Sequence, residues 1–467
     1  MSSGDRFPVA SVGGVGYNSH TMSPDELPFL DAILARPGDD APRLVYADYL
    51  SDTGSAADAA RADLIRAQLA LARLPDDHPR RAALIEQQTD LLARYQAEWT
   101  DHFRGLVGGV EFRRGLPDSV SVDAGVFATR GEELIARTRT PAGRSYLRRV
   151  HLLEPTRVLP RLLTAPALGQ LEEISLAGGD LGNGGVEQLS RGPRLASLRA
   201  LDVSFNGLDD AGVRLLARSA AFAGLHRLAL NDNGQITWDG VAALAASPHL
   251  AELTDLDLGG NDVNDAGVKA LTASRTLTRL SAVRLAHNHV GDGGVAALVG
   301  SDLFRRLLAR DLRIDLRANA IGPAGAESLA GCPDVLKATA IDLDKNYLGD
   351  RGAAALVRSL RGARLKRLRL SQNQITDAGA FVLADAVARG LPALQSIDVS
   401  VNRLTWRGAN AIRDAAVARG VVSDVSGNST EGSGPHVALG SVDPLHPDAG
   451  NVDELRRRVS FPARRDR

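Results

Sequence analysis

The sequence predicts an α/β solenoid, a right-handed horseshoe with parallel strands on its concave side and helices on its convex side, preceded by a small helical domain. Three observations predict it. The phrase L-x-x-L-x-L-x-x-N-x-L recurs from Leu198 to Asn428. Alternating apolar residues in each phrase indicate a half-buried strand, and apolar residues at i, i+3, i+4 and i+7 indicate a helix after it. Units of about 27 residues cannot bury both apolar faces alone, so neighbours must stack.

One asparagine in each phrase keeps the register of the repeat. These asparagines and the closing Asn428 are separated by 27, 28, 27, 31, 27, 27, 29 and 26 residues. Where the strand ends, the chain bends into a dry interior and leaves backbone groups without partners. A primary amide offers two donors and an acceptor there, whereas an aspartate would bury a charge. We therefore expect a structural hydrogen-bond ladder of Asn206, Asn233, Asn261, Asn288, Asn319, Asn346, Asn373 and Asn402.

Strand and helix spacing predicts the curvature of the stack. Parallel strands lie about 4.8 Å apart, whereas packed helices need about 8 to 10 Å. The strands must therefore line the inner side of the arc. Most of the repeat helices have an aspartate two residues before the glycine near their start. We expect this aspartate to cap the helix of its own unit rather than to act in catalysis. These residues are Asp210, Asp265, Asp292, Asp350 and Asp377.

The first hundred residues carry helical rather than repeating patterns. Ser23-Pro24-Asp25-Glu26 is a capping box with proline at the first helical position, and it predicts a helix. A second helix is expected after Asp40, and two more near 61–74 and 79–99. We therefore divide the chain into a disordered tail (1–22), a helical domain (23–100), a connecting and capping segment (101–155), the solenoid (156–428) and a second disordered tail (429–467).

Two parts of the chain resemble known families. Leu225, Leu228, Leu230 and Asn233, with their counterparts over roughly 147–428, resemble leucine-rich repeats of the ribonuclease-inhibitor type. Residues 29–34, 39–50 and 64–68 are similar to a bacterial repeat-companion domain that precedes such repeats. The first resemblance implies a rigid concave surface for a macromolecular partner. It also leaves open an alternative, the regulation of a GTPase, because repeats of this type are similar to those of Ran GTPase-activating proteins.

Composition excludes several classes of function. The chain is 44% hydrophobic and only 4% aromatic, as a leucine-and-alanine core requires, and its net charge of −1 gives no general attraction to nucleic acid. It has no 18-residue apolar stretch, and its first 22 residues lack the apolar run of a signal peptide, so no membrane contact is expected. The single Cys332 favours the cytoplasm. The arginine-rich finish from Arg456 to Arg467 holds a single aromatic residue, Phe461, rather than a series on which bases could stack, which favours a solvated tail.

Exposed strand residues are expected to form columns along the concave face. The first column is Ser175, Asp202, Ala229, Asp257, Arg284, Asp315, Asp342, Arg369 and Asp398. The second column is Ala177, Ser204, Asn231, Gly259, Ala286, Arg317, Asp344, Ser371 and Ser400. Aspartate could simply be the consensus residue of the unit, paired across to arginine and keeping the surface soluble. Alternatively, the charged face selects a basic protein partner, most strongly around Asp315, Arg317, Asp342 and Asp344.

The sequence favours a non-enzymatic binding protein without cofactor or metal. His287 and His289 flank the ladder residue Asn288 and lack a third ligand nearby. Asp48 and Asp63 fall on separate predicted helices with no histidine between them, so no catalytic residue is assigned. No particular arginine is singled out for the GTPase alternative.

Overall fold

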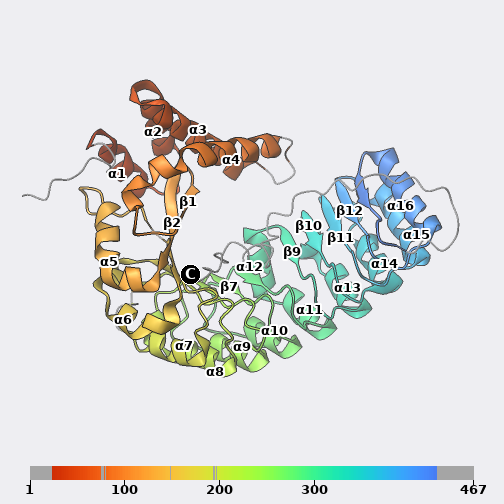
Figure 1. Cartoon of the computed structure of the whole chain (residues 1–467). Coiled ribbons are helices and arrows are strands. Elements are labelled where there is room, and N and C mark those ends of the chain that lie inside the picture. The colour runs from red at the N-terminus through yellow and green to blue at the C-terminus, as the bar shows by residue number, and fades with distance from the viewer. Residues whose placement is uncertain are drawn as a thin grey trace, which may run out of the picture.

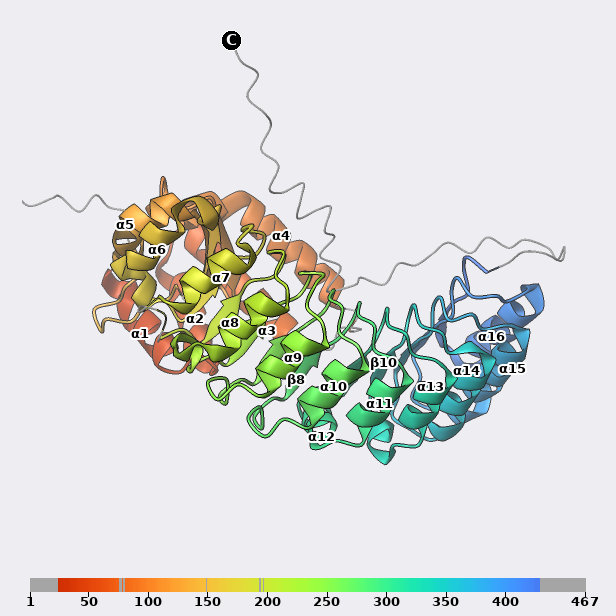
Figure 2. The same cartoon turned by 90° about the horizontal axis from the view of Figure 1, so that it is seen from below.

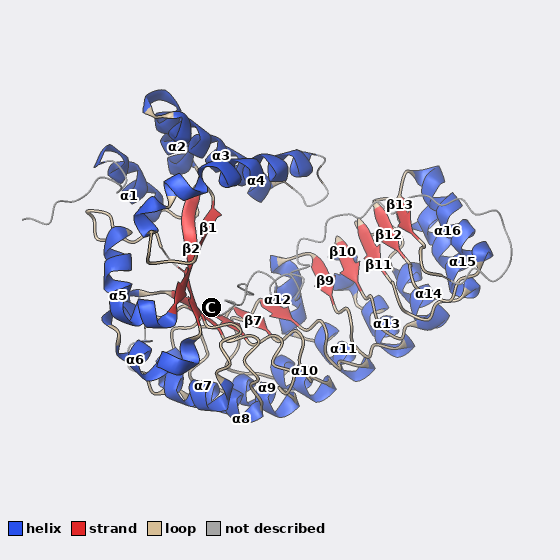
Figure 3. Cartoon of the chain, viewed as in Figure 1, coloured by secondary structure: helices blue, strands red, loops and turns tan. Residues whose placement is uncertain are grey.

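The computed structural model describes residues 24–428 apart from 75–77, 79, 148, 193, 194 and 196. The tails expected at 1–22 and 429–467, and Ser23 of the expected capping box, lie outside the described residues. The described chain forms an arc whose strands line the inner side and whose helices cover the outer side (Figures 1 and 3). The predicted α/β solenoid with a helical N-terminal region is thus confirmed.

A helical module stands at the N-terminal end of the arc. Its elements are η1 (Pro24–Glu26), α1 (Leu27–Ala35), α2 (Ala41–Thr53), α3 (Ala56–Arg73) and α4 (Arg80–Trp99). Helix α3 begins at Ala56 rather than near residue 61, because Ser55 and Asp58 form a capping box that the sequence analysis missed. Helix α4 extends over the opening of the arc in Figure 1, and Figure 2 shows the same arrangement from below.

The segment between the module and the repeats joins them through one continuous sheet. Its elements are η2 (Asp101–Phe103), β1 (Gly109–Arg113), β2 (Leu116–Asp123), α5 (Ala124–Arg137) and β3 (Arg149–Leu153). Strand β1 pairs only with β2, so its other edge needs partners. Gln68 of α3 donates to the carbonyl of Phe112 at 3.1 Å, and Gln96 of α4 donates to that of Val110 at 2.9 Å. The module therefore covers the free edge of the sheet.

The repeats follow as alternating strands and helices. The first unit is preceded by η3 (Pro155–Val158), α6 (Leu159–Thr164) and η4 (Pro166–Gln170). The strands are β4 (Glu173–Ser175), β5 (Ala200–Asp202), β6 (Arg227–Ala229), β7 (Asp255–Asp257), β8 (Ala282–Arg284), β9 (Arg313–Asp315), β10 (Ala340–Asp342), β11 (Arg367–Arg369), β12 (Ser396–Asp398) and β13 (Val422–Asp424). The helices are α7 (Gly182–Ser190), α8 (Asp210–Arg218), α9 (Trp238–Ala245), α10 (Asp265–Thr272), α11 (Asp292–Val299), α12 (Asp302–Arg310), α13 (Pro323–Ala330), α14 (Gly349–Ser359), α15 (Asp377–Asp385) and α16 (Trp406–Arg419), with short turns η6 (Ala220–Phe222), η7 (Pro333–Lys337) and η8 (Ala386–Gly390).

The sheet is interrupted between β8 and β9. Strands β1 to β8 form one sheet and β9 to β13 another. The interval between Asn288 and Asn319 is the longest of the series, at 31 residues, and it holds the additional helix α12. Arg310 of α12 donates two hydrogen bonds of 2.9 Å to the carboxylate of Asp255 on β7, two strands back. The longer interval between these asparagines reveals the insertion in the sequence, but it does not reveal that β8 and β9 are unpaired.

The asparagines lie between the strands and the outer loops, and each is between 0 and 8% exposed. Asn373 is representative. Its amide donates to the carbonyls of Leu343 at 2.7 Å and Ser371 at 3.0 Å, and its oxygen accepts the N–H of Leu348 at 3.3 Å. Two of these partners belong to the preceding unit, so each side chain ties its own unit to the one before. The ladder also crosses the sheet interruption, since Asn319 donates to the carbonyl of Leu285 at 2.9 Å.

The aspartates before the helix glycines do not cap their own helices, and that prediction was wrong. The cap of α15 is Thr376, whose hydroxyl accepts the N–H of Ala378. Asp377 instead reaches forward and accepts the N–H groups of Thr405 at 2.8 Å and Gly408 at 3.2 Å in the next unit. The same forward contact is made by Asp210, Asp265, Asp292 and Asp350. Each aspartate binds the helix of the next unit because stacking places the start of that helix beside it. The sequence of a single unit does not reveal this contact.

Candidate binding surface

Strand pairing places the first column on the inner sheet face in two rows. From β3 to β8 the partners in register are His151, Ser175, Asp202, Ala229, Asp257 and Arg284. From β9 to β13 they are Asp315, Asp342, Arg369, Asp398 and Asp424. The column therefore also contains His151 and Asp424, which the sequence analysis missed because the first and last units depart from the repeat phrase. The interruption after β8 separates Arg284 from Asp315.

The second row is built around one arginine. The guanidinium of Arg369 lies 2.8 Å from Asp344, 3.4 Å from Asp342 and 3.5 Å from Asp398. Burial raises the pKa of Asp342 to about 7, and the neighbouring charges of Asp344 and Asp315 add to the rise. Three carboxylates thus share one cation, and burial together with the neighbouring carboxylates brings the pKa of Asp342 close to neutral.

Asp344 does not lie where the column pattern places it. Its side chain is buried, and the residue is only 6% exposed. One carboxylate oxygen accepts the N–H of Ser371 at 2.7 Å and the other accepts from Arg369. Because the chain turns inward after each strand, residues of the second column sit deeper than those of the first. Asp344 therefore adds negative charge beneath the sheet face, but its buried carboxylate is not accessible from that face.

The first row is more polar than acidic. The hydroxyl of Ser175 donates to Asp202 at 2.9 Å and lies 2.9 Å from Nδ1 of His151. Burial lowers the pKa of His151, and burial raises the pKa of Asp257, whose carboxylate lies 3.5 Å from Arg284. The contacts of His151, Ser175 and Asp202 thus run across the neighbouring strands β3, β4 and β5, with Ser175 in the middle. This order differs from that of a serine nucleophile, in which the histidine lies between the serine and the carboxylate.

Basic side chains flank the acidic row on part of its length. Arg317 lies beside Asp315, with 3.7 Å between Nε and the carboxylate. Arg313 and Arg367 occupy the position two residues before the column on β9 and β11. Along β12 and β13 the corresponding residues are Ser396 and Val422. The row is therefore least compensated at its C-terminal end.

A third column, not predicted from the sequence, stands next to the ladder asparagines. The residue before each asparagine has a positive φ, including Phe205 (55°), His287 (56°), Lys345 (56°) and Val401 (52°). Glycine takes this place at Gly260 and Gly427. Phe205 and Val401 are 38% and 49% exposed. A left-handed conformation costs a bulky or β-branched residue about 1 to 2 kcal/mol, so these exposed side chains are kept at some expense in stability.

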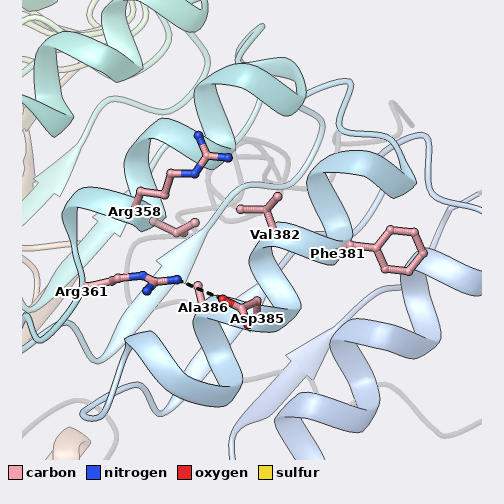
Figure 4. A pocket seen from close by; sticks show the side chains of 7 residues that line it. Arg358, Arg361, Phe381, Val382, Asp385 and Ala386 are labelled. Atoms are coloured by element: carbon pink, nitrogen blue, oxygen red, sulfur yellow. Dashed lines mark hydrogen bonds and ion pairs between the residues drawn. The ribbon is translucent and has the colours of Figure 1, made fainter.

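Two depressions lie elsewhere on the surface. One, of about 300 Å³, lies between α14 and α15 on the helical side, and Figure 4 shows the ion pair of Arg361 and Asp385 at its floor, 3.0 Å apart. Phe381 and Val382 of α15 also line it. The other, of about 530 Å³, lies between α4 and β1 and is lined by Leu92, Ala97 and Val110 among others.

Within the described ranges, no helix has both the length and the apolar character needed to cross a membrane. The same part of the chain holds no group of three or more side chains placed to bind a metal ion.

The fold and this surface define a leucine-rich repeat solenoid with an uncovered inner sheet. A family model described as "Leucine Rich repeat" matches residues 194–217, 249–271, 274–299 and 365–384. Among solved structures, an internalin (inlF) from Listeria monocytogenes str. 4b F2365 is similar, with 19% sequence identity and a TM-score of 0.37 over 61% of this chain and 67% of that chain. No curated protein matches the sequence. Leucine-rich repeat proteins generally act in protein–protein interaction.

Proposed function

We propose that the protein is a non-enzymatic binding protein that takes a protein partner on its concave face. One observation carries this proposal. Strand pairing holds Asp315, Asp342, Arg369, Asp398 and Asp424 in a single row at the strand spacing, on a sheet face that the helices leave uncovered. Such a row is a fixed array of charges and needs no reorganisation when a partner binds.

The charge balance favours a basic partner. Arg369 alone faces three carboxylates, and burial, with a further contribution from its acidic neighbours, raises the pKa of Asp342. A lysine or arginine placed beside Asp342 would favour its charged form, so binding would release a proton near neutral pH. Complementary charges of this kind contribute mainly to specificity and association rate.

The helical module supplies a second contact in this proposal. Helix α4 extends over the opening of the arc, and the groove between α4 and β1 is lined by apolar residues such as Leu92 and by polar ones such as Gln96 and Arg104. The repeat length of about 27 residues supports repeats of the ribonuclease-inhibitor type, and the position of the module directly before the repeats supports a repeat-companion domain. The free thiol of Cys332 is consistent with a cytoplasmic protein.

Regulation of a GTPase is not part of the proposal, because neither the comparisons nor the site favours it. A catalytic arginine finger must project toward the nucleotide of the partner. Arg284 pairs with Asp257, and Arg369 is surrounded by aspartates of its own sheet.

The experiment that tests the proposal compares one charge reversal on each side of the arc. A partner captured with the wild-type chain is purified, and its affinity is measured for the wild type, Asp315→Arg and Asp414→Arg. Asp315 lies on the concave face, whereas Asp414 lies on the outer helix α16 of the last unit, and both are exposed. We expect Asp315→Arg to weaken binding at least about tenfold, the loss of roughly 1.4 kcal/mol, and Asp414→Arg to leave it unchanged. Equal affinity for all three folded chains would remove the concave face from the proposal.

A further inference from the structure

The C-terminal end of the acidic row has no basic residue on either of its two strands, β12 and β13. Asp398 and Asp424 stand side by side on β12 and β13. Ser400 and Ser426, two residues after them, donate backbone N–H groups to their carboxylates at 3.0 and 2.9 Å. Asp398 already pairs with Arg369 of β11 at 3.5 Å, whereas Asp424 is exposed and forms no ion pair with a cation of the described residues. This end of the sheet face therefore presents carboxylates that a cation from outside the described structure can reach.

The chain itself carries a cationic segment beyond Asn428. Residues 456–467 contain six arginines and a single acidic residue, Asp466. The stretch before them, from 429 to 455, is acidic and carries Glu431, Asp443, Asp448, Asp453 and Glu454 with no lysine or arginine. Positive charge is therefore concentrated in one short segment, separated from the sheet by a spacer that has no attraction for the acidic row. Arginine suits such a surface because its planar guanidinium binds carboxylates through two parallel hydrogen bonds.

The spacer is long enough for this segment to reach the row. Arg456 follows Asn428 by 28 residues, and a flexible chain of that length spans roughly 29 Å on root-mean-square average. From β13 back to β10 is three strand spacings, or about 14 Å. Asn428 itself closes the loop after β13 and donates to the carbonyl of Val425 at 2.9 Å. The chain therefore leaves the solenoid within a few residues of Asp424.

We propose that the basic segment 456–467 binds in cis to the C-terminal end of the first column, at Asp398 and Asp424, and competes there with the basic partner; this regulation rests on the proposed function. Single exposed ion pairs contribute little. Covalent attachment compensates for this weakness, because joining two binding groups in one chain gives an effective concentration on the order of 1 mM. If the separate segment binds with a dissociation constant of about 100 µM, the attached segment would occupy the site about nine-tenths of the time. It would then lower the apparent affinity of a competing ligand about tenfold.

The test uses a fluorescein-labelled synthetic peptide of residues 455–467 and fluorescence anisotropy at low salt. Its affinity is measured for the full wild-type chain and for a full chain in which the six arginines of the segment are replaced by glutamine. We expect the glutamine chain to bind the peptide about tenfold more tightly, because its site is vacant. Adding Asp398→Asn and Asp424→Asn to that chain should weaken binding about tenfold or more, whereas adding Asp414→Asn should not.

Several outcomes would overturn the inference. Equal affinity of the wild-type and glutamine chains, or no binding to either, means that the segment does not occupy the face. Binding that responds equally to Asp398→Asn with Asp424→Asn and to Asp414→Asn places the peptide elsewhere. A difference that grows with protein concentration assigns the segment to the face of a second copy. Each of these results leaves the partner measurement with Asp315→Arg untouched, so the two proposals fail separately.

Discussion

The ladder asparagine Asn373 allows the stacking mechanism to be tested with one substitution, Asn373→Leu. The side chain is fully buried. Leucine would remove three hydrogen bonds, two donated to Leu343 and Ser371 and one accepted from Leu348. The carbonyl of Leu343 keeps a second donor, the amide of Asn346 at 3.1 Å. The N–H of Leu348 is left buried without a partner, which costs about 1 to 3 kcal/mol, and the lost bonds cost about 0.5 to 1.5 kcal/mol each.

The expected loss is about 3 to 5 kcal/mol of the free energy of unfolding. Urea unfolding followed by circular dichroism measures it, and hydrogen exchange at the Leu348 amide locates it. Asn428→Leu is the matched control, because Asn428 accepts the N–H groups of Asn402 and Leu404 at the last position of the ladder and is only half-buried. It should cost about 1 kcal/mol. A loss below about 1 kcal/mol for Asn373→Leu, or one no larger than for Asn428→Leu, would refute the role assigned to the ladder.

Three further substitutions have defined outcomes. Asp342 binds its proton more tightly in the folded chain than in the unfolded one, so the free energy of unfolding falls as pH rises from about 4 to 7. Asp342→Asn should therefore raise the free energy of unfolding by about 2 to 4 kcal/mol at pH 8 and hardly change it at pH 4. Urea unfolding at both pH values measures the difference. Gly115→Ala should cost about 3 kcal/mol or more in the same assay, because φ is +80° and a Cβ would clash with Ile65. Val401→Gly should stabilise by about 0.5 to 1 kcal/mol in thermal unfolding, since glycine relieves a left-handed valine.

Much of the fold could be predicted because its determinants repeat within one unit. The alternation around Leu201 and the asparagine at 206 are each visible over a dozen residues, and they fix the strand and the bend that follows. Contacts between units are different, because they depend on how far one unit is displaced along the stack. The forward reach of Asp377 to Thr405 and the loss of pairing between β8 and β9 are of this kind.

The candidate surface shows the same division. Period-2 alternation places Asp342 and Asp398 on one sheet face, and the pairing of β10, β11 and β12 aligns them. The depth of Asp344 depends on the inward turn after the strand, where alternation no longer applies. His151 and Asp424 escape the pattern because their units lack the full phrase, although β3 and β13 pair normally with their neighbours. Sequence spacing alone therefore finds the middle of the column but not its ends.

Stability and recognition rest on different residues of the same strands. The asparagines and the forward-reaching aspartates bind backbone groups of neighbouring units, so they hold the strands at their spacing whatever the first column carries. That support explains how Asp315 and Asp342 persist opposite each other on β9 and β10, although like charges opposite each other in a sheet destabilise it. Because most of these contacts join residues 24 to 34 positions apart in sequence, the row of charges is kept in register by the whole stack. Under the proposed function, a partner would meet carboxylates whose separation is set by the backbone, and selection would depend on this separation rather than on any single aspartate.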